Sequence, residues 1–170
     1  GIIAHVAHDS FSGGKRVERK ITTLIYAMRD GKVLMMKRRK QPNLGQWTAP
    51  GGKVELHESP AECALRELAE ETGLVPEGRP ELRIIATETS PLAGWQWLMF
   101  IYLLREVTGE VIDDCPEGDL AWIPLDEVEK LPIPQADAIF YPFIVSGTPG
   151  PISMKFEYDA DLILRDWRVE

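Results

Sequence analysis

The alternation of apolar and polar residues along the chain predicts a protein built mainly of β-strands. Segments rich in β-branched and aromatic residues are separated by short stretches containing glycine, proline, asparagine or aspartate, which favour turns. We predict strands over residues 20–28, 32–38, 81–88, 97–106, 120–123, 154–157 and 162–169. Asp30-Gly31 and residues 91–94 and 159–161 are predicted turns between paired strands. Residues 110–112 are expected to extend the sheet.

Two segments carry the pattern of a helix. Ser59-Pro60-Ala61-Glu62 combines a serine N-cap, a proline at the first helical position and a glutamate that closes a capping box. Gly73 is a typical helix stop, and regularly spaced apolar residues between these signals form one buried stripe. A second helix is predicted over 135–145, with a short helical turn over 125–128.

Strands on both sides of a central helix, with another helix near the end, predict an α/β (α+β) fold in which a mixed β-sheet is sandwiched between helices. The chain has 170 residues and is 44% hydrophobic, which suffices for one well-buried core rather than two. We therefore expect a single domain over residues 20–170, preceded by a poorly specified lead-in over 1–19.

Charge and cysteine content narrow the class of protein. Lys and Arg number 19 against 27 Asp and Glu, a net charge of −8, which argues against binding of intact nucleic acid. An acidic protein that handles phosphates needs metal ions to neutralise its substrate. The two cysteines form no CxxC motif or disulfide framework, which favours a reducing, cytoplasmic location. No apolar run is long enough for a membrane span, and no signal-peptide pattern is present.

Three glutamates within one helical turn are the strongest chemical signal. Glu67, Glu70 and Glu71 stand at i, i+3 and i+4, which stacks their carboxylates on one face of the helix. Like charges at this spacing destabilise a helix, whereas hard oxygen ligands in one turn suit Mg²⁺, with Mn²⁺ as the alternative cation. A solvated acidic helix face is the ordinary explanation of such a run. It does not explain the neighbouring glycines, the arginine or their spacing.

From Gly52 to Leu74, the sequence resembles the signature box of the Nudix hydrolases, G-x5-E-x7-R-E-U-x-E-E-x-G-U with U a bulky aliphatic residue. Every fixed position matches. The resemblance implies hydrolysis of a nucleoside diphosphate linked to another group, with Mg²⁺ held by the box glutamates. The chain also resembles the oxidised-purine nucleoside triphosphatases of this family, both the MutT-type and the mammalian-type enzymes that remove 8-oxo-dGTP.

The predicted hydrolytic residues follow from the box. We expect the metal ligands to be Glu67, Glu70, Glu71, the carbonyl of Gly51 and, by resemblance to the mammalian-type enzyme, Glu117; an exposed loop charge is the alternative for Glu117. Glu67 and Glu70 are the predicted catalytic residues, with Glu67 favoured as general base. Structural roles are expected for Gly52, Glu58, Arg66 and Gly73. Among them, Arg66 orients the glutamates by ion pairing and Glu58 anchors the loop.

The same resemblance implies a nucleotide pocket containing Thr23, Lys37, Thr48 and Asp137. Asp137 matches one of two adjacent base-reading aspartates, and Ala136 replaces the other. Trp95, Trp97, Phe100 and Phe140 are interpreted as core residues in preference to base-stacking groups. Trp47 is a stronger candidate for the pocket because it lies beside the glycine loop.

These features predict a Mg²⁺-dependent pyrophosphohydrolase that converts nucleoside triphosphates, including oxidised purines such as 8-oxo-dGTP, to monophosphate and pyrophosphate. Hydrolysis of an ADP-sugar or a dinucleoside polyphosphate at the same site is the second hypothesis. The third is a module that senses a nucleotide without cleaving it. The expected partner is a small nucleotide rather than nucleic acid or membrane, and the protein is expected to be a monomer or homodimer.

Overall fold

A mixed β-sheet forms the centre of the protein. The computed structural model describes residues 17–170, so most of the predicted lead-in over 1–19 lies outside the described residues. The strands are β1 (Lys20–Arg29), β2 (Lys32–Arg38), β3 (Trp47–Thr48), β4 (Gly51–Lys53), β5 (Val75–Glu77), β6 (Glu81–Thr89), β7 (Trp97–Leu104), β8 (Glu106–Thr108), β9 (Gly118–Pro124), β10 (Ile152–Tyr158) and β11 (Leu164–Val169). The helices are α1 (Pro60–Thr72), a 3₁₀ turn η1 (Val128–Lys130) and α2 (Gln135–Val145).

The sheet has the order β11-β10-β6-β7-β1-β2-β3, with β4 also pairing with β1 and β9 with β2. β1 runs parallel to β7, and β10 runs parallel to β6, whereas the other pairs in the sheet are antiparallel. The sheet is therefore mixed, as predicted.

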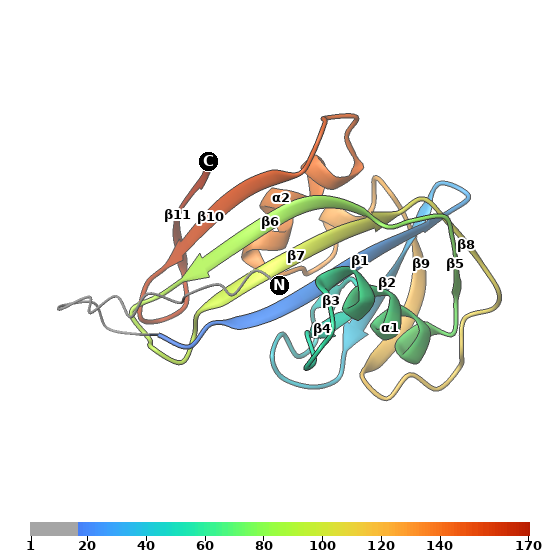
Figure 1. Ribbon diagram of the computed structural model, residues 1–170, viewed down its shortest axis with the longest axis horizontal. Helices are drawn as coiled ribbons and strands as arrows, with labels where there is room; N and C mark the ends of the chain where they lie inside the picture. The colour runs from blue at the N-terminus through green and yellow to red at the C-terminus, as the bar shows by residue number, and fades with distance from the viewer. Residues whose placement is uncertain (1–16) are drawn as a thin grey trace, which may run out of the picture.

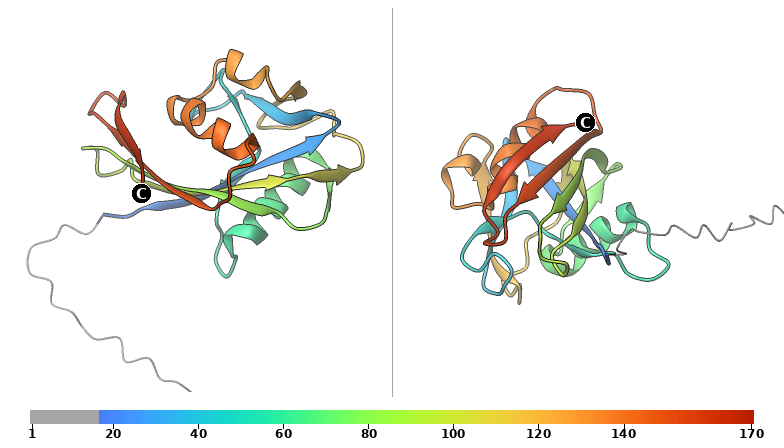
Figure 2. Two further views of the ribbon diagram at one scale, coloured as in Figure 1. Left: turned by 90° about the horizontal axis from the view of Figure 1, so that it is seen from above. Right: turned by 90° about the vertical axis from the view of Figure 1, so that its left-hand side faces the viewer.

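The two helices cover opposite faces of this sheet, α1 on one side and α2 on the other (Figures 1 and 2). Ala64 and Leu68 of α1 pack with buried residues of β1, β2 and β7 into one apolar cluster. Phe140 and Ile144 of α2 pack with buried residues of β6, β7 and β10 into the other. This layered arrangement confirms the predicted sandwich.

Both ends of α1 match their sequence signals. The Ser59 hydroxyl accepts a hydrogen bond from the Glu62 N–H, and the Glu62 carboxylate accepts one from the Ser59 N–H. Gly73 ends the helix with φ of 75°, a left-handed conformation that glycine adopts without steric cost. These ends fix the position of the intervening glutamates relative to the sheet.

The predicted extension of the sheet by residues 110–112 is wrong. β8 instead pairs with β5 in a separate two-stranded sheet, and the Ile112 N–H binds the carbonyl of Thr72 at the end of α1. The last carbonyls of a helix need partners from outside the helix, and this segment supplies one of them. The helical turn predicted over 125–128 lies slightly later, at η1.

Within residues 17–170, no helix is long and apolar enough to cross a membrane.

Candidate active site

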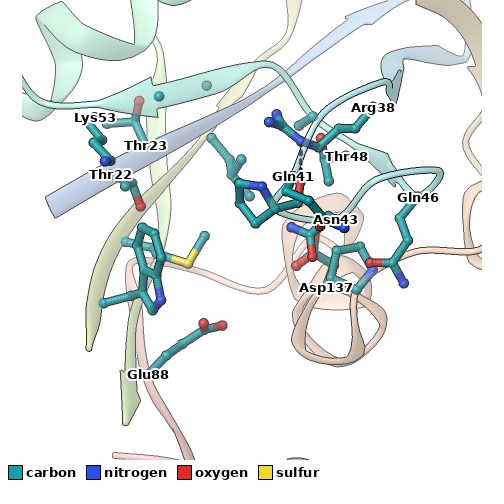
Figure 3. A pocket seen from close by; sticks show the side chains of 18 of the residues that line it. Thr22, Thr23, Arg38, Gln41, Asn43, Gln46, Thr48, Lys53, Glu88 and Asp137 are labelled. Carbon is teal, nitrogen blue, oxygen red and sulfur yellow. Dashed lines mark hydrogen bonds between the residues drawn. The ribbon is translucent and has the colours of Figure 1, made fainter. Parts of the chain in front are cut away.

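A single large pocket of about 630 Å³ brings together the predicted box and residues distant from it in sequence. Its walls come from β1, β4, α1, β6, β7, the start of α2 and the loop between β2 and β3. Figure 3 shows Thr22, Thr23 and Lys53 on one side of this pocket, with Thr48 and Asp137 on another. The site has two ends: one beside α1, named the hydrolytic end after the predicted hydrolytic residues that it contains, and an inner end between the sheet and α2.

Arg66 organises the hydrolytic end. Its Nε lies 2.6 Å from Glu58 Oε2, and its Nη1 lies 2.8 Å from Glu67 Oε1 and 3.2 Å from Glu70 Oε2. The hydrogen bond from Arg66, joined by one from the Glu55 N–H, lowers the pKa of Glu58 to about 2. Arg66 therefore occupies the orienting position expected of it, and Glu58 anchors the loop before α1.

Glu71 is the most buried glutamate of the box. It is 7% exposed, and its Oε2 accepts a hydrogen bond of 3.1 Å from the Gly51 N–H. Burial, followed by the negative charge of Glu67, raises the pKa of Glu71 to about 8. The charge of Glu117 contributes in the same direction. Glu67, Glu71 and Glu117 thus line one pocket, near enough for their charges to interact.

The glycines at 51 and 52 allow this convergence. A Cβ on Gly51 would collide with the Thr23 carbonyl, and a Cβ on Gly52 would collide with the Glu67 carboxylate. Only glycine leaves room for both contacts. The glycine pair therefore places backbone directly against the carboxylates.

The carboxylates fit a hard divalent cation in chemistry. Glu67, Glu71 and Glu117 line the pocket and supply oxygen donors, and Gly51 adds backbone at the same place. Within the described part of the chain, no three His, Cys, Asp or Glu side chains are already grouped as a metal site. One reason is that Arg66 binds Glu67 and Glu70 through the same nitrogen.

Glu70 lies outside the pocket. Its side chain is 60% exposed and its carboxylate is ion-paired with Arg66. Of the four glutamates predicted as ligands, the structure brings Glu67, Glu71 and Glu117 to the pocket wall and leaves Glu70 at its outer edge.

The predicted substrate residues divide in a similar way. Thr23, Thr48 and Asp137 line the pocket and are buried, and the Thr23 hydroxyl lies 3.2 Å from the Cys63 sulfur. Lys37 is exposed on β2 and does not line the wall. Arg38, the next residue, lines it instead.

Sequence reasoning missed Glu88, which together with the predicted Asp137 makes the inner end of the pocket acidic. Glu88 on β6 is 7% exposed, and its Oε1 accepts a hydrogen bond of 3.3 Å from the hydroxyl of Tyr158 on β10. Burial raises the pKa of Glu88 to about 7. Burial and then the charge of Glu88 raise the pKa of Asp137 well above its ordinary value. The sequence contained one indication of this role. In the predicted strand, Glu88 follows Ile84 and Ala86 at every second position and so shares their face, which is buried.

The aromatic residues also divide. Phe140 is fully buried in the core, and Phe100 packs against the cluster under α1, as predicted. The core interpretation is wrong for Trp95 and Trp97, which both line the pocket. Trp47 packs against the core and does not line the pocket, contrary to expectation.

The loop between β2 and β3 is fastened to the segment that carries Glu117. Arg39 binds the carbonyls of Cys115 and Gly118 and the carboxylate of Asp119, and Lys40 pairs with Glu117 at 3.6 Å. The same loop contributes Gln41 and neighbouring residues to the pocket wall.

Comparison with known proteins identifies the family. Residues 18–144 match the NUDIX domain. An uncharacterised Nudix hydrolase of Bacillus subtilis, YvcI, is 29% identical over 144 residues, covering 83% of this chain and 88% of the relative. The ADP-ribose pyrophosphatase of Methanocaldococcus jannaschii is 31% identical over 105 residues, covering 61% of this chain and 60% of the relative.

A solved structure agrees over nearly the whole length. The crystal structure of a mutator MutT protein from Bacillus halodurans superposes with a TM-score of 0.78 at 30% identity, covering 89% of this chain and 97% of that one. The domain match extends from the first strand to the second helix and includes the carboxylate site. The chain therefore belongs to the Nudix family and is a Nudix hydrolase.

Proposed function

We propose that this Nudix hydrolase is a divalent-metal-dependent pyrophosphohydrolase of nucleoside triphosphates, with oxidised purine nucleotides among its substrates. One observation carries the proposal. A single pocket joins converging carboxylates at one end to a buried inner end with acidic and aromatic side chains at the other. A pocket with these two ends suits a molecule that has a charged phosphate chain and a flat polar base.

Glu67, Glu71 and Glu117 would hold the cation, with the Gly51 carbonyl as a further oxygen donor at the same pocket wall. When bound, Mg²⁺ neutralises phosphate charge and lowers the pKa of a coordinated water. Lys53 and Arg38 line the same pocket and offer N–H donors to phosphate oxygens.

Glu67 is our candidate for the base that accepts the proton of the attacking water. Its carboxylate lines the pocket, and the ion pair of 2.8 Å with Arg66 fixes its position. A general base must be held within hydrogen-bond reach of the water, and Arg66 provides this restraint. Glu58 in turn restrains Arg66, so the positioning extends back into the loop before α1.

The test is turnover of a nucleotide panel with identified products in ¹⁸O-labelled water. We expect monophosphate and pyrophosphate from triphosphates, with turnover that depends on Mg²⁺ or Mn²⁺. Diphosphate and orthophosphate as primary products would contradict the proposed bond cleavage. Tight nucleotide binding without any turnover would instead favour a sensing module.

Hydrolysis of ADP-ribose is the second candidate. The similarity to the archaeal ADP-ribose pyrophosphatase favours it, although the match covers only 60% of that relative. Including ADP-ribose and a dinucleoside polyphosphate in the panel separates the candidates. Release of AMP and ribose 5-phosphate at a higher kcat/KM than for any triphosphate would replace the first proposal with the second.

A further inference from the structure

Glu88 lies on β6 in a row of side chains whose other members belong to the hydrophobic core. Along β6, Ile84, Ala86 and Glu88 point to the α2 side of the sheet, and the first two are fully buried in its core. Across the strands, Glu88 lies opposite Trp97 on β7 and Phe156 on β10. An apolar residue would continue the core at this place. A carboxylate here needs a reason other than packing.

Among the described residues, no cationic side chain forms an ion pair with this carboxylate. Within residues 17–170, the only side chain that binds Glu88 is the neutral hydroxyl of Tyr158. Asp137, on the other side of the inner end, is 6% exposed and has neither an ion pair nor a hydrogen bond to another side chain in the same part of the structure. Buried acids without a compensating cation are costly, which makes them candidates for ligand recognition.

Two further polar atoms at the inner end lack partners in the described structure. The Trp97 Nε1–H and the Thr22 hydroxyl are both buried without a hydrogen bond, and both residues line the pocket. Thr22 is 9% exposed. Because Glu88 and Trp97 are direct cross-strand neighbours on one face and both line the pocket, the same part of its wall carries an acceptor and a donor. Such a pair matches a ligand edge that carries a donor beside an acceptor.

We propose that Glu88 and Trp97 read the oxidised edge of an 8-oxopurine, while Asp137 reads its other edge. The N7–H of an 8-oxopurine would donate to Glu88, and its C8 carbonyl would accept from the Trp97 N–H. An unmodified purine has a bare N7 acceptor and no C8 carbonyl, so it would leave both groups unsatisfied. Figure 3 shows Glu88 and Asp137 entering the pocket from different sides, as two-edged recognition requires.

This inference rests on the proposed nucleotide substrate. It also implies that the preference for oxidised over unmodified purines is the same for guanine and adenine. Guanine and adenine differ at the edge assigned to Asp137, whereas their 8-oxo forms share the edge assigned to Glu88. Loss of Glu88 should therefore reduce discrimination against both unmodified purines. Loss of Asp137 should alter the choice between guanine and adenine types.

The experiment compares kcat/KM for 8-oxo-dGTP, dGTP, 8-oxo-dATP and dATP in the unaltered protein, Glu88→Gln and Asp137→Asn. We expect Glu88→Gln to lower both oxo-to-unmodified ratios about tenfold to a hundredfold. Asp137→Asn should change the ratio of 8-oxo-dGTP to 8-oxo-dATP instead. The matched control is Glu81→Gln, because Glu81 is on the same strand, pairs with Arg105 and does not line the pocket.

Two additional measurements keep the test decisive. The first uses only the unaltered protein, so it does not depend on whether Glu88→Gln folds. 8-Bromo-dGTP carries a substituent at C8 but has no N7–H donor, so we expect it to be as poor a substrate as dGTP. Quenching of tryptophan fluorescence by 8-oxo-dGMP and dGMP measures binding without hydrolysis. If no triphosphate is cleaved but 8-oxo-dGMP binds more tightly through Glu88, the proposed function fails and the edge assignment stands.

Equal treatment of oxidised and unmodified purines by the unaltered protein, in turnover and in binding, would overturn the inference. So would unchanged ratios in folded Glu88→Gln. Loss of the same discrimination in Glu88→Gln and Asp137→Asn would overturn the assignment of separate edges.

Discussion

The two ends of the pocket contain acidic residues in opposite electrostatic settings. At the hydrolytic end, Arg66 pairs with Glu58, Glu67 and Glu70, so much of the negative charge is balanced by a neighbour on the same helix. At the inner end, Glu88 and Asp137 are buried with no cation beside them in the described structure. The first arrangement positions carboxylates that work as anions. The second holds buried acids that have acceptor positions left for the donors of a ligand.

This difference separates two ways in which a pocket can use a carboxyl group. A carboxylate fixed by an arginine keeps its charge and geometry before any ligand arrives. A buried acid without a partner is unfavourable until a ligand supplies hydrogen bonds, so it rewards a matching ligand and disfavours others. Rate should therefore depend on the first end, and selectivity on the second.

The largest expected effect is on turnover at the hydrolytic end. Glu71→Gln and Glu67→Gln should each lower kcat by about 10²–10⁴-fold, because each replaces a carboxylate that would hold the cation with a weaker amide ligand. Glu70→Gln, on the same helix but outside the pocket, should have a clearly smaller effect. Steady-state kinetics at saturating Mg²⁺, with thermal melting to verify folding, measures this. A larger loss in Glu70→Gln than in Glu71→Gln would show that the ligands rearrange.

Gly52→Ala tests the close approach of backbone and carboxylate. The added methyl would displace the Glu67 carboxylate, and a misplacement of about 1 Å in a catalytic group can lower the rate about 10²-fold. Because the obstructing atoms are the end of a flexible side chain, the melting temperature should change little. Gly147→Ala is the control, since an added Cβ there meets nothing within 4 Å. Full activity in Gly52→Ala would separate Glu67 from catalysis.

Glu88 should make stability depend on pH. Its folded pKa of about 7 is above the ordinary value of 4.5, so the folded state binds the proton more tightly than the unfolded state. The resulting stabilisation is complete below about pH 4.5 and is lost as the pH rises through about 7. Glu88→Gln should remove this dependence and stabilise the protein at pH 8 by up to about 3 kcal/mol. Urea unfolding of both proteins at pH 5 and pH 8 measures the difference. If the free energy of unfolding of Glu88→Gln changes with pH as much as that of the unaltered protein, another group is responsible for the titration.

The smallest effect concerns the start of α1, which positions the hydrolytic end alone. Ser59→Ala removes one half of the capping box and should lower the free energy of unfolding by about 1 kcal/mol. Ser153→Ala, at an exposed position on β10, is the matched control. Selection among nucleotides should be unchanged in Ser59→Ala, whereas an altered base preference would mean that the two ends are coupled through α1.

The sequence predicted the hydrolytic end well because its residues are contiguous. Glu58, Arg66, Glu67 and Glu71 lie within one loop and helix, where periodicity determines which side chains share a face. Cap signals placed the helix ends, and strand patterns placed most of the sheet. Glu70 shows the limit of this reasoning, because helical spacing alone does not say which of two adjacent carboxylates faces a pocket.

The inner end could not be predicted in the same way. Glu88, Trp97, Asp137 and Tyr158 come from β6, β7, α2 and β10, and only the strand order brings them together. Lys37 was assigned to the pocket by resemblance alone, and in the structure it is exposed on β2 while Arg38 lines the wall. The charge of Glu88 in a buried row was visible in the sequence, but its significance required the position of α2 above the sheet.

The parallel pairing of β1 with β7 has a consequence for how the protein folds. Lys20 lies opposite Trp97, so this central ladder requires closure of a loop that contains β2, α1 and β6. Contacts between residues so distant in the chain slow folding, because the entropy of closure is lost before the ladder compensates for it. Thr22 and Trp97, which form part of the inner wall, meet only when this ladder has formed. The selective end of the pocket is therefore expected to assemble late, after the local structure of α1 and its glutamates.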